Sequence, residues 1–277
     1  MGIQWTEIQK RRLHELNSQR DLQESFADEK QRDQEFREEE SILVNAGREH
    51  LAALRAGIRR PGLSVLREKL VSALTKEGFT EVVTPTIISR RMLEKMTIDE
   101  SHALFSQVFW VNSNKCLRPM LAPNLYYVSK DLLRIWSQPV RIFEIGSCFR
   151  KESQGSTHLN EFTMLDLVEW GLPEEERQAH LQHFAKLVME TAGLPDYALE
   201  QENSVVYGDT VDVTCAGVEA ASCSEGPHPL DGKWGISSTW VGLGFGLERL
   251  LMLREQGQNV KCYSKSISYL DGVRLNI

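Results

Sequence analysis

The sequence lacks several features that would place it outside ordinary globular proteins. No apolar run approaches the roughly 20 residues that a membrane-spanning helix needs, and the first residues, MGIQWTEIQKRRLHEL, are charged where a secretory signal peptide is apolar. Cysteine is scarce and forms no C-x-x-C pair, which argues against a disulfide framework or a structural zinc site. We therefore expect a cytoplasmic protein with buried thiols. The cysteines are Cys116, Cys148, Cys215, Cys223 and Cys262.

Positive charge is in deficit, with 32 Lys and Arg against 39 Asp and Glu and a net charge of −7 at pH 7. This balance argues against a non-specific coating of nucleic acid, although a local basic surface still binds a phosphate backbone. The 277 residues, 41% hydrophobic and 26% charged, are enough for one large domain or two ordinary ones with a buried core.

Residues 1–60 contain no proline and only three glycines, and they are rich in residues that favour helices. Apolar residues recur there at spacings of three and four, which predicts amphipathic helices that pack on another element. The acidic run at 35–40 is interpreted as a solvated helix face. Four arginines gather toward the end of this region, and we expect them to contact phosphates. They are Arg48, Arg55, Arg59 and Arg60.

The composition changes at Pro61, which predicts a second region over 61–277. Ser64 is interpreted as a helix N-cap and Gly78 as the end of that helix. Strands outnumber the remaining helices and do not alternate with them, so we predict an α+β fold with an antiparallel sheet flanked by helices. The expected strands lie at 79–85, 107–111, 140–145, 162–168 and 210–213, and the expected helices at 122–135, 174–192 and 245–254.

Two segments could hold a nucleotide. The strand beginning at Arg141 ends in Phe149-Arg150-Lys151-Glu152, a loop with His158 follows, and the chain returns from Glu161. Arginine holds a phosphate by two parallel hydrogen bonds, and a neighbouring aromatic ring offers a stacking face; an ordinary surface hairpin fits this pattern equally well. Three alternating glycines within 242–249 would let backbone approach a ligand, or form only a flexible strand end.

Glu219 and Ser222 place two oxygen-bearing side chains three residues apart. Magnesium takes one or two protein oxygens and completes its coordination with phosphate and water, so the pair suits the metal of a nucleotide. The alternative is an exposed glutamate and a buried serine with no ligand.

In this order, the segments resemble the three motifs of class II aminoacyl-tRNA synthetases. The helix and strand ending at Pro85 resemble motif 1, the hairpin at 149–152 resembles motif 2, and 242–249 resembles motif 3. Four strings resemble, more narrowly, the pyrrolysyl-tRNA synthetase family, in the form without a separate N-terminal tRNA-binding domain. They are Leu117–Tyr126, Lys151–Leu165, Val206–Thr210 and Trp240–Leu251.

The resemblance implies that ATP activates pyrrolysine or a related amino acid as an adenylate, which passes to the 3′ end of a tRNA. It also implies Mg²⁺, a homodimer built partly through motif 1, and tRNA contact by residues 1–60. Arg150 and Arg249 would be catalytic and would hold the α- and γ-phosphates. The remaining ATP-binding residues would be Glu152, His158 and Phe162 near adenine, with Glu219 and Ser222 holding the metal.

The resemblance also implies an amino-acid pocket, and here the chain departs from the family. Asp166 stands where an asparagine is usual, Ser129 and Ser224 where larger or apolar residues are, and Glu225 where an apolar one is. An ionised aspartate has no hydrogen to donate to a substrate carbonyl, so we hypothesise that Asp166 meets a donor or a cation. Alternatively it is paired or protonated and specificity is unchanged. The pocket residues are Ala122, Leu125, Tyr126, Ser129, Asp166, Val168, Tyr207, Ser224, Trp240 and Gly242.

Two other functions stay open. A synthetase-like ligase would pass the adenylate to a non-tRNA acceptor, but the arginines of 48–60 would then have no role. A non-catalytic paralogue would bind tRNA or amino acid only, and would be expected to have lost residues that hold ATP. Those residues, Arg150, Glu152, Glu219 and Arg249, are all present.

Overall fold

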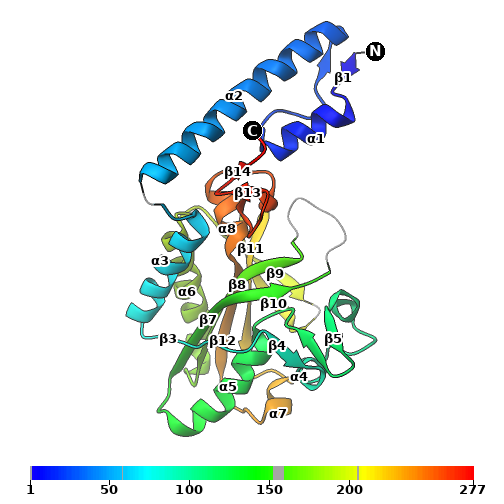
Figure 1. Cartoon of the computed structure of the whole chain (residues 1–277). Helices are drawn as coiled ribbons and strands as arrows, with labels where there is room; N and C mark the ends of the chain where they lie inside the picture. Colours follow the sequence, from blue (N-terminus) through cyan, green and yellow to red (C-terminus); the bar gives the residue numbers. More distant parts are fainter. Residues whose placement is uncertain (1, 58, 152–158, 205) are drawn as a thin grey trace.

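A seven-stranded sheet forms the centre of the protein in the computed structural model, which describes residues 2–57, 59–151, 159–204 and 206–277 (Figure 1). The strand order is β3-β7-β8-β12-β11-β10-β9, and every pairing except β3 with β7 is antiparallel. The predicted α+β fold is therefore confirmed. The strands are β3 (Thr80–Glu81), β7 (Val140–Phe149), β8 (Glu161–Trp170), β9 (Ala198–Ser204), β10 (Gly208–Cys215), β11 (Val218–Gly226) and β12 (Trp240–Gly246).

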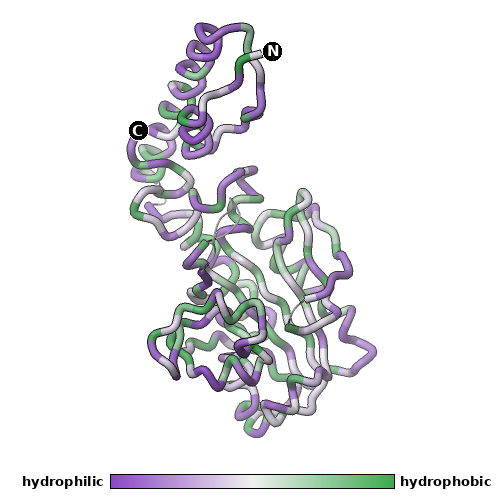
Figure 2. The backbone as a smooth tube through the Cα atoms, turned by 90° about the vertical axis from the view of Figure 1, so that its right-hand side faces the viewer, coloured by the Kyte–Doolittle hydropathy of each residue, from purple (hydrophilic) through white to green (hydrophobic). Residues whose placement is uncertain are grey.

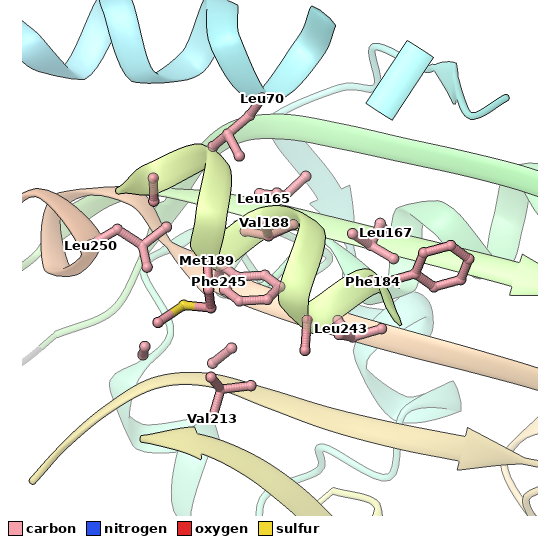
Figure 3. Close-up of a cluster of buried hydrophobic side chains, with 14 of the residues drawn as sticks. Leu70, Leu165, Leu167, Phe184, Val188, Met189, Val213, Leu243, Phe245 and Leu250 are labelled. Atoms are coloured by element: carbon pink, nitrogen blue, oxygen red, sulfur yellow. The ribbon is translucent and has the colours of Figure 1, made fainter. Parts of the chain in front are cut away.

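One face of this sheet is closed by helices. Figure 3 shows α6 lying across it, with Phe184 and Val188 pointing toward Leu165, Leu243 and their neighbours on the strands. Since successive side chains of a strand point to opposite faces, the apolar residues of each strand enter this core and the residues between them face away. The covering helices are α3 (Gly62–Lys76), α6 (Arg177–Ala192) and α8 (Leu247–Arg254).

The opposite face is covered only in part. Val168 and Trp170 of β8 pack there with Trp240 of β12 and with Leu125 and Tyr126 of α5, in a second buried cluster. The remainder of the face stays open toward the cavity described below. The elements on this side are α4 (Arg90–Lys95), α5 (Ala122–Ile135), α7 (Asp231–Trp234) and a small sheet of β4 (Ile87–Ser89), β5 (Trp110–Asn112) and β6 (Lys115–Leu117).

The N-terminal region is largely helical and stands at one end of the molecule, mostly hydrophilic in Figure 2. A small core of Trp5, Leu13 and Phe26 joins its elements, whereas α2 has no fully buried residue. The α2 helix also packs near the C-terminus, since a Cβ at Gly47 would lie 3.0 Å from Val273 Cγ1. The elements are β1 (Ile3–Gln4), α1 (Glu7–Glu15), β2 (Ser25–Phe26), α2 (Glu29–Ala56), β13 (Tyr269–Leu270) and β14 (Val273–Arg274).

The acidic run of α2 is not simply a solvated face, and that interpretation was wrong for three of its residues. Glu35 pairs with Arg20 at 2.9 Å, and Glu40 with Arg12 at 2.7 Å. Glu39 accepts a 2.7 Å hydrogen bond from the Ser18 hydroxyl. These carboxylates therefore connect α2 to α1 and to the loop after α1. This is because successive residues of a helix point in different directions, so part of the acidic run faces α1 and part faces water.

Several predicted boundaries are confirmed and others shift. The helix at 122–135 has the predicted limits, and Gly78, with φ +88°, follows the end of α3 in the left-handed region that favours glycine. Ser64 is not an N-cap, because α3 begins at Gly62 with Pro61 in the capping position, where a missing N–H costs nothing.

The other differences concern short segments. The strand at 79–85 reduces to β3, because only two of its residues pair with β7. The segment at 107–111 divides between the 3₁₀ helix Ala103–Gln107 and β5, and Phe245 and Gly246 extend β12 rather than begin α8. Among the cysteines Cys215 is only half-buried. None of the described helices combines the length and apolar character that crossing a membrane requires.

Candidate active site

A cavity of about 650 Å³ opens on the sheet face opposite α6. It is bordered by residues of β8, β10, β11, β12 and α5, so segments distant in sequence meet there. The lining includes fourteen of the predicted site residues: Ala122, Leu125, Tyr126, Arg150, Phe162, Asp166, Val168, Tyr207, Glu219, Ser222, Ser224, Trp240, Gly242 and Arg249. The structure brings these residues together, and their individual roles stay predictions.

The alternating glycines of β12 provide the space. Leu243 and Phe245 point into the core beneath α6, so Gly242 and Gly244 face the cavity. A Cβ at Gly244 would lie 2.9 Å from the Asp166 Oδ1 atom, and one at Gly242 would lie 3.1 Å from the Trp240 ring. A side chain at either position would therefore displace groups that line the cavity.

Two guanidinium groups from different elements face this cavity. Arg150, just after β7, lies over the Phe162 ring at 5.2 Å, and its Nε donates to the Pro119 carbonyl at 2.9 Å. Arg249, in α8, donates to the Glu219 carbonyl at 2.8 Å. Two cations on separate supports suit an extended anion with more than one charged group, such as a triphosphate.

A buried ion pair positions the segment that holds Arg150. Arg118 lies 2.7 Å from Glu144 and also donates to the Ser147 carbonyl at 2.8 Å, which fixes residues 118–119 against β7. Both side chains are almost fully buried. This contact holds residues 118–119 against β7, and with them the Pro119 carbonyl that accepts from Arg150. Removing one member of such a pair would leave an uncompensated buried charge.

Oxygen-bearing side chains gather where β10 and β11 pair. Glu219 and Ser222 of β11 line the cavity together with Asp212 of β10, which the sequence analysis missed. Burial raises the pKa of Asp212, a hydrogen bond from Ser222 lowers it, and the nearby Glu219 carboxylate raises it further. No group of three or more His, Cys, Asp or Glu side chains suited to a metal occurs among the described residues. The set nevertheless fits Mg²⁺, which needs few protein ligands when phosphates supply the rest.

Aromatic rings line the rest of the cavity, and one buried carboxylate accepts hydrogen bonds from two of them. Asp231 accepts hydrogen bonds from the Tyr126 hydroxyl at 2.7 Å and from the Trp240 Nε1–H at 2.8 Å. Tyr207 packs edge-on against Trp240, and burial raises the pKa of both tyrosines, so their phenols stay protonated. Sequence reasoning missed Asp231 because Pro-Leu-Asp-Gly is typical of an ordinary turn.

Asp166 is the most unusual group in the cavity. Its side chain is buried, with 8% of the residue exposed, and Oδ1 has no hydrogen-bond partner among the described residues. Burial raises the pKa of Asp166 to about 7, while the Arg150 charge lowers it and the Glu144 carboxylate raises it. The carboxyl is therefore divided between its neutral and charged forms near neutral pH.

Some predicted residues lie elsewhere. Ser129 is fully buried but does not line the cavity, and the Glu225 side chain is partly exposed, 3.7 Å from Arg177. Glu152 and His158 lie outside the described residues. The predicted phosphate-binding arginines are exposed at the end of α2 and in the segment after it, away from the cavity: Arg48, Arg55, Arg59 and Arg60.

Comparisons with known proteins agree with this fold. A family model described as the phenylalanyl tRNA synthetase beta chain CLM domain matches residues 51–225. A crystal structure of pyrrolysyl-tRNA synthetase from Desulfitobacterium hafniense is 56% identical, with a TM-score of 0.95 and both chains fully covered. A second structure of that organism's enzyme is 54% identical, with a TM-score of 0.93, and covers all of this chain and 96% of the other.

A more distant likeness is to a threonine–tRNA ligase of Anaplasma marginale (strain Florida), 29% identical over 134 residues, which are 46% of this chain. The chain spans about a fifth of the length of that ligase, 21%. The antiparallel sheet and its flanking helices are those of a class II aminoacyl-tRNA synthetase catalytic fold. Within this class, the chain belongs to the pyrrolysyl-tRNA synthetase family.

The raised pKa of Asp166 predicts a pH-dependent stability. Between about pH 4 and the folded pKa of about 7, the native state binds more protons at this group than the unfolded state, so its contribution to the free energy of unfolding falls as pH rises, by at most about 1.4 kcal/mol per pH unit. We expect Asp166→Asn to gain stability relative to the parent chain from pH 4 to 7 and to level off above. Urea unfolding across this range measures the difference, with Asp209→Asn on the exposed part of β10 as control. Parallel stability curves for parent and Asp166→Asn would refute it.

Proposed function

We propose that this chain activates pyrrolysine or a related amino acid with ATP and transfers it to the 3′ end of a tRNA in the cytoplasm. The observation that supports this most directly is the convergence of Arg150 and Arg249 on one cavity from segments about a hundred residues apart. The full coverage of a pyrrolysyl-tRNA synthetase structure supports the same reaction.

The described residues fit the activation step without a side-chain nucleophile. The amino acid's own carboxylate attacks the α-phosphate of ATP and pyrophosphate leaves. Arg150 would neutralise the charge that develops on the α-phosphate oxygens, and Arg249 would hold the γ-phosphate. Phe162, beneath Arg150, would stack on adenine. The protein's contribution is alignment and charge neutralisation in a site that is already formed.

Magnesium is part of the proposal. Glu219 and Ser222 would hold it, with Asp212 beside them. When bound, the ion would neutralise phosphate charge, and it would also relieve the repulsion between the Asp212 and Glu219 carboxylates. The adenine contacts proposed for Glu152 and His158 lie outside the described residues.

The tRNA would meet the N-terminal region. Arg55 and Arg59 border a second concavity, with Leu51, Leu54 and Pro61 around it. Arg60 pairs with Glu68 at 2.5 Å, on an exposed surface where such pairs contribute little and a phosphate competes readily. A local basic cluster on an acidic protein suits a nucleic-acid backbone, as predicted for residues 1–60.

A homodimer belongs to the same proposal. Val83 and Ile87 follow β3 and are 86% and 49% exposed in the single chain. In the proposed homodimer a partner chain would cover these two side chains, which lie at the end of motif 1 and just beyond it. The expected mass in solution is twice the 31.6 kDa of the chain.

The role of Arg150 is tested by pyrophosphate exchange. Arg150→Ala removes a charge from the phosphate cavity, so we expect exchange to fall by about 100-fold or more with the circular dichroism spectrum unchanged. Arg67→Ala, which removes an exposed arginine of α3, is the matched control and should exchange normally. Near-normal exchange by Arg150→Ala would mean that the ATP site lies elsewhere.

The tRNA contact is tested by salt dependence. The double variant Arg55→Ala, Arg59→Ala should weaken tRNA binding, and it should lower the slope of log affinity against log salt by about one to two, since each lost phosphate contact removes somewhat less than one counterion. Pyrophosphate exchange, which needs no tRNA, should be unaffected. Lys186→Ala, which removes an exposed cation of α6, is the control. An unchanged slope in the double variant would place the tRNA elsewhere.

A further inference from the structure

Asp166 lies in the part of the cavity where the side chain of a bound amino acid would contact it. It lies in the middle of β8, opposite Glu144 of β7 on one side and Gly244 of β12 on the other. It lines the cavity with the aromatic residues Tyr207 and Trp240, and its Oδ1 is buried without a partner. A buried polar atom left unpaired costs free energy, and Gly244 leaves the space in front of it open.

We propose that the amino acid accepted by this cavity carries a cationic nitrogen in its side chain, which pairs with the Asp166 carboxylate. The inference rests on the proposed function and specifies its substrate class. A neutral side chain without a donor would leave the ionised carboxylate unpaired, and an acceptor atom placed against it would be repelled unless a proton lay between them. A cationic nitrogen instead supplies the missing donor and cancels a buried charge.

The surroundings favour a cation further. Tyr207 and Trp240 line the cavity, and aromatic rings attract cations. Two cations lower the pKa of Asp166, Arg150 more strongly than Arg118. Under the proposed function Arg150 binds the α-phosphate, so bound ATP would add negative charge close to Asp166. A cationic side chain on the substrate would offset the negative charge that the nucleotide adds near Asp166.

The charged and titratable groups near Asp166 come from several elements. They are Arg118 before α5, Glu144 and Cys148 of β7, Arg150 after β7, and Tyr207 between β9 and β10. Burial raises the pKa of Cys148 and Tyr207, so both stay neutral, and Arg118 is paired with Glu144. The group that titrates near neutral pH and faces the substrate is therefore Asp166 itself.

The experiment compares two nearly isosteric substrates by pyrophosphate exchange. In Nε-prolyl-lysine the ring carries a protonated amine, and in Nε-cyclopentanecarbonyl-lysine a methylene replaces it. We expect the parent chain to prefer the cationic compound by about tenfold or more in kcat/KM, equivalent to about 1.4 kcal/mol. Asp166→Asn should reverse the preference. Asp212→Asn makes the same change among the proposed metal-site residues and should leave the ratio of the two substrates unchanged, whatever its effect on the rate.

The pH dependence of the substrate preference distinguishes an ion pair with Asp166 from a better steric fit of the cationic compound. From about pH 5.5 to 7.5, where a secondary amine stays protonated, the preference for the cationic compound should rise up to about tenfold per pH unit and then level as Asp166 becomes ionised. This rise should be absent in Asp166→Asn, which does not titrate.

Different failures identify different errors. If the parent chain turns over the neutral compound as well as the cationic one, the inferred substrate class is wrong while the proposed function stands. If no compound, pyrrolysine included, supports exchange, the proposed function itself fails, and the inference fails with it.

Discussion

The alternation of side chains across one sheet is the constraint on which the rest of the structure depends. Leu165, Leu167, Leu243 and Phe245 must all enter the core under α6, and a strand offers no way to bury them without turning the intervening residues to the other face. Among those residues are Asp166, Val168, Gly242 and Gly244, which line the cavity. The site is therefore the reverse side of the hydrophobic core.

Charge then divides the cavity into parts. The two arginines and the Asp212, Glu219 and Ser222 group suit a triphosphate and its metal, while the aromatic walls held by Asp231 suit a long side chain. Asp166 lies where these parts meet, since it is within the influence of Arg150 and beside Tyr207. Under the proposed function and the inferred substrate class, a single carboxyl there would link the binding of the nucleotide to the charge of the amino acid.

Much of the fold follows from local sequence. The helix at 122–135 and the long strands β7 and β8 were predictable because their apolar periods are strong. Two interpretations based on weak local signals were wrong. The N-cap of α3 is Pro61 and not Ser64, and the acidic run of α2 partly faces α1. In the site, Asp212 and Asp231 were missed, since nothing in their sequence neighbourhood distinguishes a buried, shared carboxylate from one in an ordinary turn or strand.

The order of the three motifs, the alternating glycines and the presence of both arginines can be read from the chain, because they are properties of residue type and spacing. Three facts emerge only from the folded protein: Arg150 and Arg249 face one cavity, Ser129 and Glu225 do not line it, and the Asp166 carboxyl is buried without a partner at Oδ1. Which side chains lie close together, and which are removed from water, depends on how segments far apart in the chain pack. Both conditions change the protonation and the contacts of a side chain, and the adjacent residues in the sequence do not reveal them.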